Sequence, residues 1–557
     1  MSSNAVRSLL FVVFAVSVVA QTPSIRTSEG VLSAASFAYS GLPNGGIPQG
    51  SLFAIFGDNL GPAQLVEVTA FPLPTTAGLA GTSVAVTVNG TTVNAIMIYT
   101  VKTQVAAVLP SNTPVGTGTL TVTYNGQTSN AVPIHVVAGA FGIYAVNQAG
   151  SGPGIIQNFE SSGDVVNAVN QAAQPGQVEI IWGTGLGPVS GDEAGGVLPG
   201  DMPNLDVHVF VGTMEAPIQY RGRSGCCVGD DQIVFTVPAG IEGCHVPVSV
   251  VLDGVVSNYV TMAISSSGNT CTDPNGYTAS QLQLFLNNPS VKLSSMVVSR
   301  GFDRNMSSVG YQAGGAPYRD DAIEAVYENY PSTGFLNGAG QPPIGTCEVT
   351  QVPGAAPPNV GFLDGGVLTE TGPVGPRTIF KSSTGVYQIV FSPVSPSAPN
   401  VVNDGTVITA GTYSFNSTAG SQVGAYATSI NHPATFSWNE FSGFPATIDR
   451  TKPLTLTWTG GTAGAMINIF GKSAYASGPV GDMGAQFQCL ADGGAGSFTI
   501  PASVLSALPA TFSGQAGAHG SFSFSQYIFG TPPTIPGIDI STISAADIFS
   551  IFGETYQ

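Results

Sequence analysis

The hydrophobic positions of this chain fall into short runs that alternate with polar residues, and turn-forming residues separate the runs. Residues 83–88 alternate between polar and apolar side chains and end at Asn89-Gly90, a dipeptide typical of a type I′ hairpin turn. Residues 119–124 alternate in the same way before a second Asn-Gly dipeptide. Side chains of a β-strand point alternately to opposite faces, so this period of two predicts strands with one buried face. We therefore expect an all-β chain built largely from antiparallel hairpins.

The chain also repeats itself. The segment 48–62 returns as 174–188, where Gly50 matches Gly176 at an offset of 126 residues. A second anchor lies further along, where Asn130 matches Asn258 at an offset of 128. Two anchors with nearly the same offset indicate a duplicated module, and the regular strand spacing predicts an antiparallel β-sandwich for each copy. Duplicated β modules usually serve reach and contact rather than catalysis.

A glycine follows an apolar strand at the same place in each copy, Gly57 in the first and Gly183 in the second. We expect these glycines to adopt a positive φ or to mark a bulge before a tight loop. A phosphate-binding loop is the alternative, but such a loop is followed by a helix, and no helical period follows either glycine.

The domain boundaries follow from the repeat and from changes in residue composition along the chain. Helix-forming residues at 277–286 behind a Thr/Ser start predict a short linker helix, and residues 541–552 predict a closing helix. The predicted organisation is a signal peptide at 1–20, module one at 21–150, module two at 151–268, a linker with a short helix at 269–290, one larger β-sandwich or jelly roll at 291–535, and a tail at 536–557.

The repeated segments resemble the IPT/TIG modules, which are immunoglobulin-like (E-set) domains, and more closely a set of uncharacterised exported proteins of soil bacteria that carry such modules. The resemblance covers about residues 30–265 and rests on segments 50–60, 72–74, 84–90, 103–110, 183–188 and 231–238. The C-terminal region is similar to a module of the same kind of exported protein, through segments 364–368, 411–413, 423–426, 449–450 and 458–461. The resemblance implies immunoglobulin-like sandwiches but no particular activity, because such modules serve as spacers, receptor parts and accessory domains.

Composition and charge narrow the classes of partner. The net charge is −18, and 14 Lys and Arg in 557 residues cannot build a basic footprint, which disfavours nucleic-acid binding. The mean hydropathy of +0.26 comes from many short runs rather than from a membrane span. Arg7 and the apolar run 9–20 predict a secretory signal peptide cleaved after Ala20, with a membrane anchor as the alternative. We expect a secreted or cell-surface protein with no membrane span after cleavage.

Six cysteines fit an exported protein with disulfide bonds. A vicinal Cys226–Cys227 ring is strained, so we expect one of these two residues to pair with Cys244 and the other with Cys271. Zinc binding by these four residues is the alternative, although their spacing is not the paired form of common zinc sites. The remaining two, Cys347 and Cys489, would close a long loop and constrain the denatured state.

The motifs of common enzyme classes are missing from the sequence. No G-x-S-x-G occurs, and the five histidines show no metal-ligand spacing, so we interpret each as a solvated or strand-face residue. A glycosidase would need two carboxyl groups, for which Asp320, Asp321 and Glu324, or Glu440 and Asp449, are candidates. Asp230-Asp231 or Asp320-Asp321 could take part in calcium binding, but two adjacent carboxylates are fewer oxygens than such a site needs. We expect no cofactor and identify no catalytic residue.

An aromatic platform for sugar rings is the remaining candidate site. Trp458 alternates with Leu454 and Leu456 on an apolar strand face, which indicates a core residue. Trp438 is followed by Asn439 and Glu440, so it is the better candidate for an exposed ring beside polar groups. We therefore assign Trp438, Asn439 and Glu440 as the candidate ligand-binding residues.

Three functional hypotheses remain from the sequence. The first is a non-enzymatic exported protein whose two modules display a C-terminal β-sandwich for adhesion or ligand binding, to an extracellular polysaccharide or a surface protein. The second is an extracellular carbohydrate-active enzyme with the modules as spacers. The third is a structural component of the cell envelope, which would self-associate and bind no soluble ligand.

Overall fold

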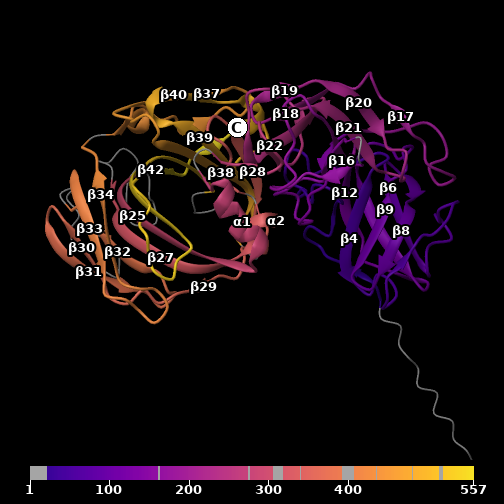
Figure 1. Cartoon of the computed structure of the whole chain (residues 1–557). Helices are drawn as coiled ribbons and strands as arrows, with labels where there is room; N and C mark the ends of the chain where they lie inside the picture. The colour runs from indigo at the N-terminus through magenta and orange to yellow at the C-terminus, as the bar shows by residue number, and fades with distance from the viewer. Residues whose placement is uncertain are drawn as a thin grey trace, which may run out of the picture.

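The structure is a computed structural model, and it describes residues 22–160, 163–273, 276–304, 318–338, 340–391, 407–434, 436–478, 481–512 and 519–557. Strands make up 50% of the chain and helices 5%, which confirms the all-β fold class. Figure 1 shows module one (indigo to violet) on one side, module two in magenta above it, and a larger curved β region in orange and yellow. No helix of the described ranges is long and apolar enough to cross a membrane. The predicted signal peptide lies outside these ranges.

Module one packs two sheets around an apolar core. The first sheet contains, in order, β1 (Ser24–Ile25), β4 (Leu52–Asp58), β9 (Gln104–Val108), β8 (Ile96–Val101) and β5 (Val66–Glu67), with β2 (Val31–Ser33) paired to β4. The second contains β3 (Ile47–Pro48), β12 (Val132–Val137), β10 (Gly116–Tyr124), β6 (Thr82–Val88) and β7 (Thr91–Asn94), with β11 (Gln127–Thr128) paired to β10. The predicted hairpin at Asn89-Gly90 is confirmed, because φ is 50° and 77° there and the turn joins β6 to β7.

Module two repeats this arrangement. Its first sheet contains β15 (Val165–Val166), β14 (Ile156–Asn158), β16 (Val178–Thr184), β21 (Asp231–Thr236), β20 (Ile218–Arg223) and β17 (Gly200–Asp201), with β13 (Gly142–Ile143) paired to β16. Its second contains β19 (Met214–Ala216), β18 (Val207–Val211), β22 (Gly243–Leu252) and β23 (Val255–Val256), with β24 (Val260–Ile264) paired to β22. Because β13 belongs to this sheet, module two begins before the predicted boundary at residue 151.

The second anchor of the repeat has the same hydrogen bonds in both copies. Asn130 accepts from the backbone N–H of Ile25 at 2.8 Å and donates to its carbonyl at 3.0 Å. Asn258 does the same with the N–H and carbonyl of Ile143, at 2.8 and 2.9 Å. In each module this side chain replaces a missing strand neighbour for the first strand, which satisfies backbone groups that would otherwise lack a partner.

Gly57 and Gly183 also have matching environments, but their predicted positive φ is wrong. A Cβ atom would meet the carbonyl oxygen of Ser24 at Gly57 and that of Gly142 at Gly183. Both glycines are therefore required by the close approach of the first strand of their module. The left-handed conformation lies two residues further on, at Asn59 (φ 55°) and at the matching Gly185 (φ 107°).

The linker contains the predicted helix, α1 (Ala279–Asn287). Thr278 and Gln281 form a capping box, in which each side chain bonds the backbone N–H of the other residue. A second short helix, α2 (Ser332–Asn337), packs on α1 through Phe285 and Phe335, whose ring centres lie 4.1 Å apart.

The C-terminal region is built on a 14-stranded sheet. Its order is β28 (Cys347–Val352), β39 (Gly481–Asp492), β38 (Met466–Gly478), β41 (Gly520–Phe529), β42 (Ile540–Phe552), β25 (Ser290–Arg304), β27 (Asp321–Pro331), β32 (Tyr387–Phe391), β31 (Gly375–Lys381), β30 (Leu368–Gly372), β33 (Gly411–Ser417) and β34 (Tyr426–His432), with β26 (Tyr318–Arg319) on β25 and β29 (Gly361–Phe362) on β27. Smaller sheets pair β35 (Ser437–Trp438), β37 (Leu454–Thr459) and β40 (Ser497–Ile500), and β36 (Thr447–Ile448) with β43 (Thr555–Tyr556). Helix α3 (Ala502–Ser506) follows β40.

This large sheet encloses two hydrophobic cores rather than one. The first half of β25 and β42 contributes Met296 and Ile543 to one core, which the strands from β27 to β34 complete. The second half contributes Phe549 and the partly buried Phe302 to the other core, which the smaller sheets cover. β25 and β42 pair in parallel over twelve residues, so they join the two cores into one unit.

The predicted closing helix at 541–552 is wrong, because these residues form β42. Its segment contains alanines that suit a helix, but Ile543, Ala545, Phe549 and Ile551 lie at odd positions and are all buried. Pairing with β25 on one side and β41 on the other satisfies the backbone of β42 and decides the outcome. The segment 536–557 is therefore an integral part of the sheet rather than a tail.

The disulfide pairing differs from the expectation for four of the six cysteines. Cys244 bonds Cys271, with Cα atoms 5.2 Å apart, and the exposed Cys226 and Cys227 bond each other. The physical reason is placement: Cys244 lies on β22 facing the linker, whereas the other two lie in the loop between β20 and β21. Cys347 bonds Cys489, the pairing considered from the sequence. Three disulfides are typical of proteins that fold in an oxidising compartment.

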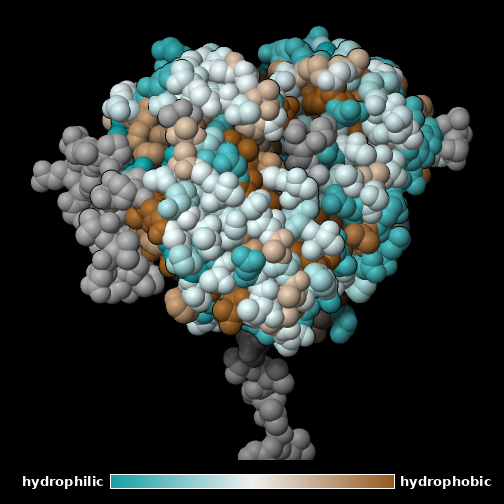
Figure 2. Space-filling model, turned by 60° about the vertical axis from the view of Figure 1, so that its left-hand side comes forward, coloured by the Kyte–Doolittle hydropathy of each residue, from teal (hydrophilic) through white to brown (hydrophobic). Residues whose placement is uncertain are grey.

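The two modules pack directly against the C-terminal region. Val256 and Tyr259 of module two belong to the same core cluster as Trp458, and Tyr259 is only 6% exposed. Tyr39 of module one donates a hydrogen bond to the carbonyl of Pro353 at 2.9 Å. On the face drawn in Figure 2, the described apolar residues lie in separate patches among polar ones. The apolar surface that joins module two to the C-terminal region is thus buried inside the molecule.

Candidate functional site

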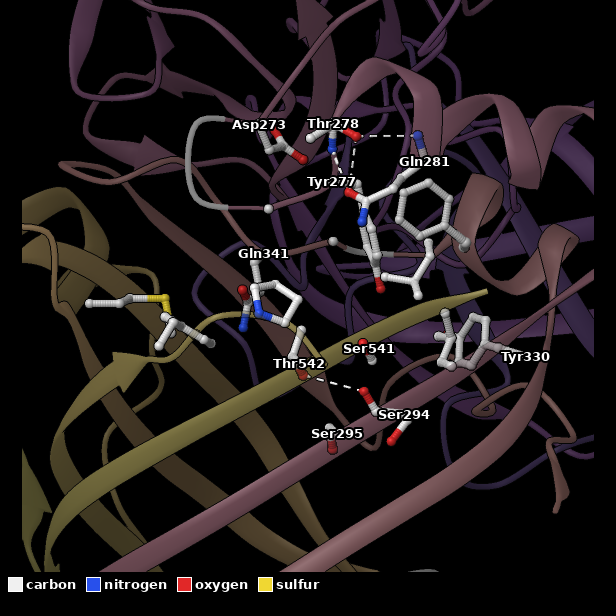
Figure 3. A pocket seen from close by; sticks show the side chains of 18 of the residues that line it. Asp273, Tyr277, Thr278, Gln281, Ser294, Ser295, Tyr330, Gln341, Ser541 and Thr542 are labelled. Atoms are coloured by element: carbon white, nitrogen blue, oxygen red, sulfur yellow. Dashed lines mark hydrogen bonds between the residues drawn. The ribbon is translucent and has the colours of Figure 1, made fainter. Parts of the chain in front are cut away.

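The candidate site is a pocket of about 680 Å³ at the junction of module two, the linker and the C-terminal region. His245 enters from module two, and Tyr277 and Gln281 enter from the linker. Strands β25, β27 and β42 supply much of the remaining lining, together with segment 340–344 and residues of β38, β39 and β41. Figure 3 shows the linker side chains above these strands, with Gln341 and Thr542 near the middle. Pockets at domain junctions that combine apolar and polar groups are the usual place for ligands.

The floor of the pocket is one face of the large sheet. The register pairs Leu293 of β25 with Glu328 of β27, and Ser295 with Val326, so these four side chains share a face. Ile540 and Thr542 of β42 pair with Leu293 and Ser295 and continue the two rows. The floor therefore alternates apolar groups with small hydroxyl groups, and Ser295 and Thr542 are both exposed.

An aromatic cluster holds the wall opposite this floor. The ring of Phe335 lies edge-on to His245 at 5.4 Å and to Tyr277 at 5.1 Å. Tyr277 also packs edge-on against Phe285 at 5.2 Å, which fixes it against α1. The capping box of α1 holds Thr278 and Gln281 at the rim of the pocket, as the dashed lines in Figure 3 show.

The described residues of the lining include two carboxyl groups, Asp273 and Glu328, and no Lys or Arg. Asp273 is engaged by the protein, since its Oδ1 accepts from the backbone N–H of Cys244 at 2.6 Å and its Oδ2 lies 3.7 Å from Nδ1 of His245. Glu328 has no ion-pair or hydrogen-bond partner among the described residues. The charge of the site therefore comes from a carboxyl group that faces the pocket, which disfavours an anionic ligand.

Burial shifts the pKa values of three lining groups upward. Desolvation raises the pKa of Tyr277 to about 12, and the nearby Tyr330 and Glu328 add to the effect. Desolvation also raises the pKa of Glu328 and, together with the charge of Glu328, that of Tyr330. Tyr277, Tyr330 and Glu328 are therefore close enough for the charge of one to shift the pKa of another.

Trp438, Asn439 and Glu440, assigned from the sequence, do not form a ligand-binding platform. Trp438 is 3% exposed and packs against Phe444, Phe522 and other rings of the core. Its indole N–H donates to Glu440 at 2.8 Å, and Glu440 also accepts from the backbone N–H of Thr457 at 3.0 Å. The assignment is wrong because the indole extends from the smaller sheet into the core and packs on the large sheet, and the polar neighbours hold the turn.

One member of each acidic pair considered for calcium is engaged by protein groups. Asp231 is fully buried, bonds the guanidinium of Arg223, and accepts from the backbone N–H groups of Gly185 and Leu186 at 2.7 and 2.8 Å. Asp321 is fully buried and accepts from Arg319 at 2.8 and 3.0 Å. Each of these carboxylates has its oxygens committed to cationic or amide groups, so neither offers the open set of ligands that calcium requires.

Within the described residues one group of three metal-ligating side chains comes close together, Cys226, Cys227 and Asp230. The two sulfur atoms are bonded to each other, so they do not provide thiolate ligands.

The sequence predicts each histidine to be solvated or on a strand face, and the histidines of β22 and β34 lie on strands but are buried. His135 is exposed on β12, but His245 and His432 are 3% and 1% exposed. Burial lowers the pKa of His432, and the neighbouring Arg300 adds to this effect. His245 is the histidine that reaches the pocket. In the sequence it was marked only by its position beside Cys244.

The comparisons with known proteins identify no family. No protein-family model and no curated protein matches the chain. The solved structures it matches include a Ca²⁺-stabilised adhesin with which an Antarctic bacterium binds ice (11% identity, 95% of this chain, 98% of that chain, TM-score 0.11) and SGBP-B of the Bacteroides ovatus mixed-linkage glucan utilization locus in complex with a heptasaccharide (11%, 90% and 92%, TM-score 0.13). Another is domains 4–9 of the surface layer protein SbsC (10%, 96% and 83%, TM-score 0.17). At these TM-scores the matches carry no argument about function.

Proposed function

We propose that this chain is an exported binding protein that holds a hydroxylated ligand, a glycan chain, in the pocket between module two, the linker and the C-terminal region. The observation that carries the proposal is the composition of that pocket. It combines apolar and aromatic groups with hydroxyl, amide and carboxyl groups, and none of the lining residues that the structure describes is Lys or Arg. Sugars present apolar faces and many hydroxyl groups, so this mixture complements them.

The disulfide bonds and the predicted signal peptide support the exported location. The buried contacts between the modules and the C-terminal region support a rigid, pre-formed site rather than a flexible string of spacers, and pre-formed sites lose less conformational entropy on binding. In this proposal module two is a part of the binding site, because it supplies His245.

The test is binding of the chain without its signal peptide to a panel of soluble and insoluble polysaccharides, scored for both retention and released sugar. Ser295→Trp fills the exposed floor of the pocket and is expected to lower affinity at least about tenfold, a loss of about 1.4 kcal/mol. Thr119→Trp is the matched control, since Thr119 is exposed on β10 of module one, far from the pocket.

An equal loss in both variants, or no loss in Ser295→Trp, would contradict the assignment of the pocket. Release of sugar from any polysaccharide would show an enzyme and contradict a purely binding role. Absence of binding to every member of the panel would contradict the glycan ligand itself.

A further inference from the structure

The pocket floor has an uncompensated charge. Glu328 is half-buried, and no Lys or Arg of the described residues lies within ion-pair distance of it. Its neighbours Tyr277 and Tyr330 offer hydroxyl groups but no positive charge. A carboxylate that is partly removed from water without a cation is unfavourable, so a ligand that supplies a cation at this point gains free energy.

A second carboxyl group continues the same face of β27. Glu324 lies four residues from Glu328, which is about 13 Å along a strand, and side chains at this spacing point to the same side. The amide of Gln388 donates to Glu324 Oε2 at 2.9 Å, and the charge of Glu324 contributes to the raised pKa of Tyr527. As with Glu328, no cationic side chain of the described residues pairs with it.

The two glutamates and the pocket lie on one continuous face. Val326, between them at an alternate position, lines the pocket together with Phe529, which pairs through Ser544 with Val297 beside Glu324. A chain-like ligand that enters the pocket at Glu328 and follows β27 therefore passes Glu324. Charged groups about 13 Å apart along such a ligand would lie close to both carboxylates.

We propose that the pocket selects an amino-sugar chain, whose protonated amines pair with Glu328 and, further along β27, with Glu324. This inference rests on the proposed function and names the class of glycan. Hydroxyl groups of the sugar would bond Ser295 and Thr542 on the floor. An N-acetylated chain of the same length keeps the hydroxyl groups but has no cation, so it leaves both carboxylates unpaired.

The experiment compares a glucosamine hexamer with the N-acetylglucosamine hexamer by calorimetry on the chain without its signal peptide. It is done at physiological ionic strength, where general attraction to an acidic surface is screened beyond about 8 Å. We expect the glucosamine hexamer to bind at least about tenfold more tightly, as for one charge-assisted hydrogen bond. Glu328→Gln should remove most of that preference and leave the affinity for the acetylated chain within about twofold.

Glu67→Gln is the matched control, because Glu67 is exposed on β5 of module one. Equal affinity for the two hexamers, or the same loss of affinity in Glu67→Gln, would overturn this inference and leave the proposed function standing. Binding of a neutral glucan from the panel without binding of the glucosamine hexamer would do the same. Failure of every sugar to bind would overturn both.

Discussion

Strand β10 of module one and strand β22 of module two occupy matching places in the repeat but have different surroundings. Leu120 and Val122 of β10 match Val248 and Val250 of β22, and all four are fully buried in their own sandwich. The opposite face differs: on β10 Thr117 and Thr119 are exposed and the two threonines that follow are half-buried, whereas nearly every residue of β22 is buried. Thr117, Thr119, Thr121 and Thr123 of module one are replaced by His245, Pro247, Ser249 and Val251.

The comparison shows that the same sandwich either stays solvated or forms a wall of the candidate site according to one face of one strand. The threonine hydroxyl groups of β10 form hydrogen bonds with water, so this face of the strand is stable without a covering element. Three of the four hydroxyl groups are lost in module two, where His245 lines the pocket and Val251 packs against the shared core. His245 reaches the pocket from this face, so the candidate site depends on the change.

The largest expected effect comes from Tyr259, which fills the interface on the module-two side. Tyr259→Ala should lower the free energy of unfolding by about 3–5 kcal/mol, because it leaves a cavity in a shared core. Tyr259→Phe keeps the ring and removes only the hydroxyl, which bonds Ser249 and Ser503, so it should cost about 1 kcal/mol. Denaturant unfolding checks both variants, and equal losses would show that the ring does not hold the interface.

The disulfide of module two gives the next effect. Cys244→Ser with Cys271→Ser opens a loop of 27 residues and should lower the stability of module two by about 3–4 kcal/mol. The Cys226–Cys227 disulfide joins adjacent residues and closes no comparable loop. Cys226→Ser with Cys227→Ser should therefore change stability by less than about 0.5 kcal/mol. Hydrogen exchange resolved by module measures the losses. Module one has no cysteine, so faster exchange there would argue that the two modules unfold as one unit.

Lysine introduced at matching positions on the outward faces of β22 and β10 tests whether each face is buried. Val251→Lys places a charge against the shared core and should cost about 2 kcal/mol. Thr123→Lys, at the matching position of β10, should stay within about 0.5 kcal/mol. Thermal and chemical unfolding of the two variants provide the measurement. Similar costs would mean that the outward face of β22 is not buried in solution.

The smallest expected effect concerns a difference inside the sandwiches. Glu179 matches the buried Phe53 of module one, and its carboxyl group is fully buried without a hydrogen-bond partner among the described residues. Desolvation, with a contribution from Glu160, raises the pKa of Glu179 to about 9. The folded state therefore holds a proton that the unfolded state loses above pH 4.5, so stability falls as the pH rises from about 4.5 to 9.

Glu179→Gln removes this dependence. The variant should be more stable than the parent chain by about 2 kcal/mol at pH 6, with little difference near pH 4.5. The difference between the two proteins isolates Glu179, because the other buried carboxyl groups, Asp303, Glu348 and Glu554, are present in both. Denaturant unfolding across this pH range is the measurement, and parallel pH profiles would contradict a protonated Glu179.

Local features of the fold could be predicted because their causes are local. The period of two, the Asn-Gly turns and the capping box of Thr278 and Gln281 act within a few residues, so they gave the strands, the hairpins and helix α1. The duplication could be read from the two offsets, and the bonds of Asn130 and Asn258 show why the second anchor is repeated. None of the pocket residues was recognised, because each is unremarkable in its own segment.

The sequence by itself determined the all-β class and the two copies of the module, and its six cysteines predicted disulfide bonds. Only the tertiary structure decided that 541–552 is a strand, because its backbone is satisfied by β25, which lies about 250 residues earlier in the chain. The same is true of the burial of Trp438 and of the meeting of His245, Glu328 and Thr542. These outcomes depend on which faces pack together, and packing between distant segments leaves no period or spacing in the sequence.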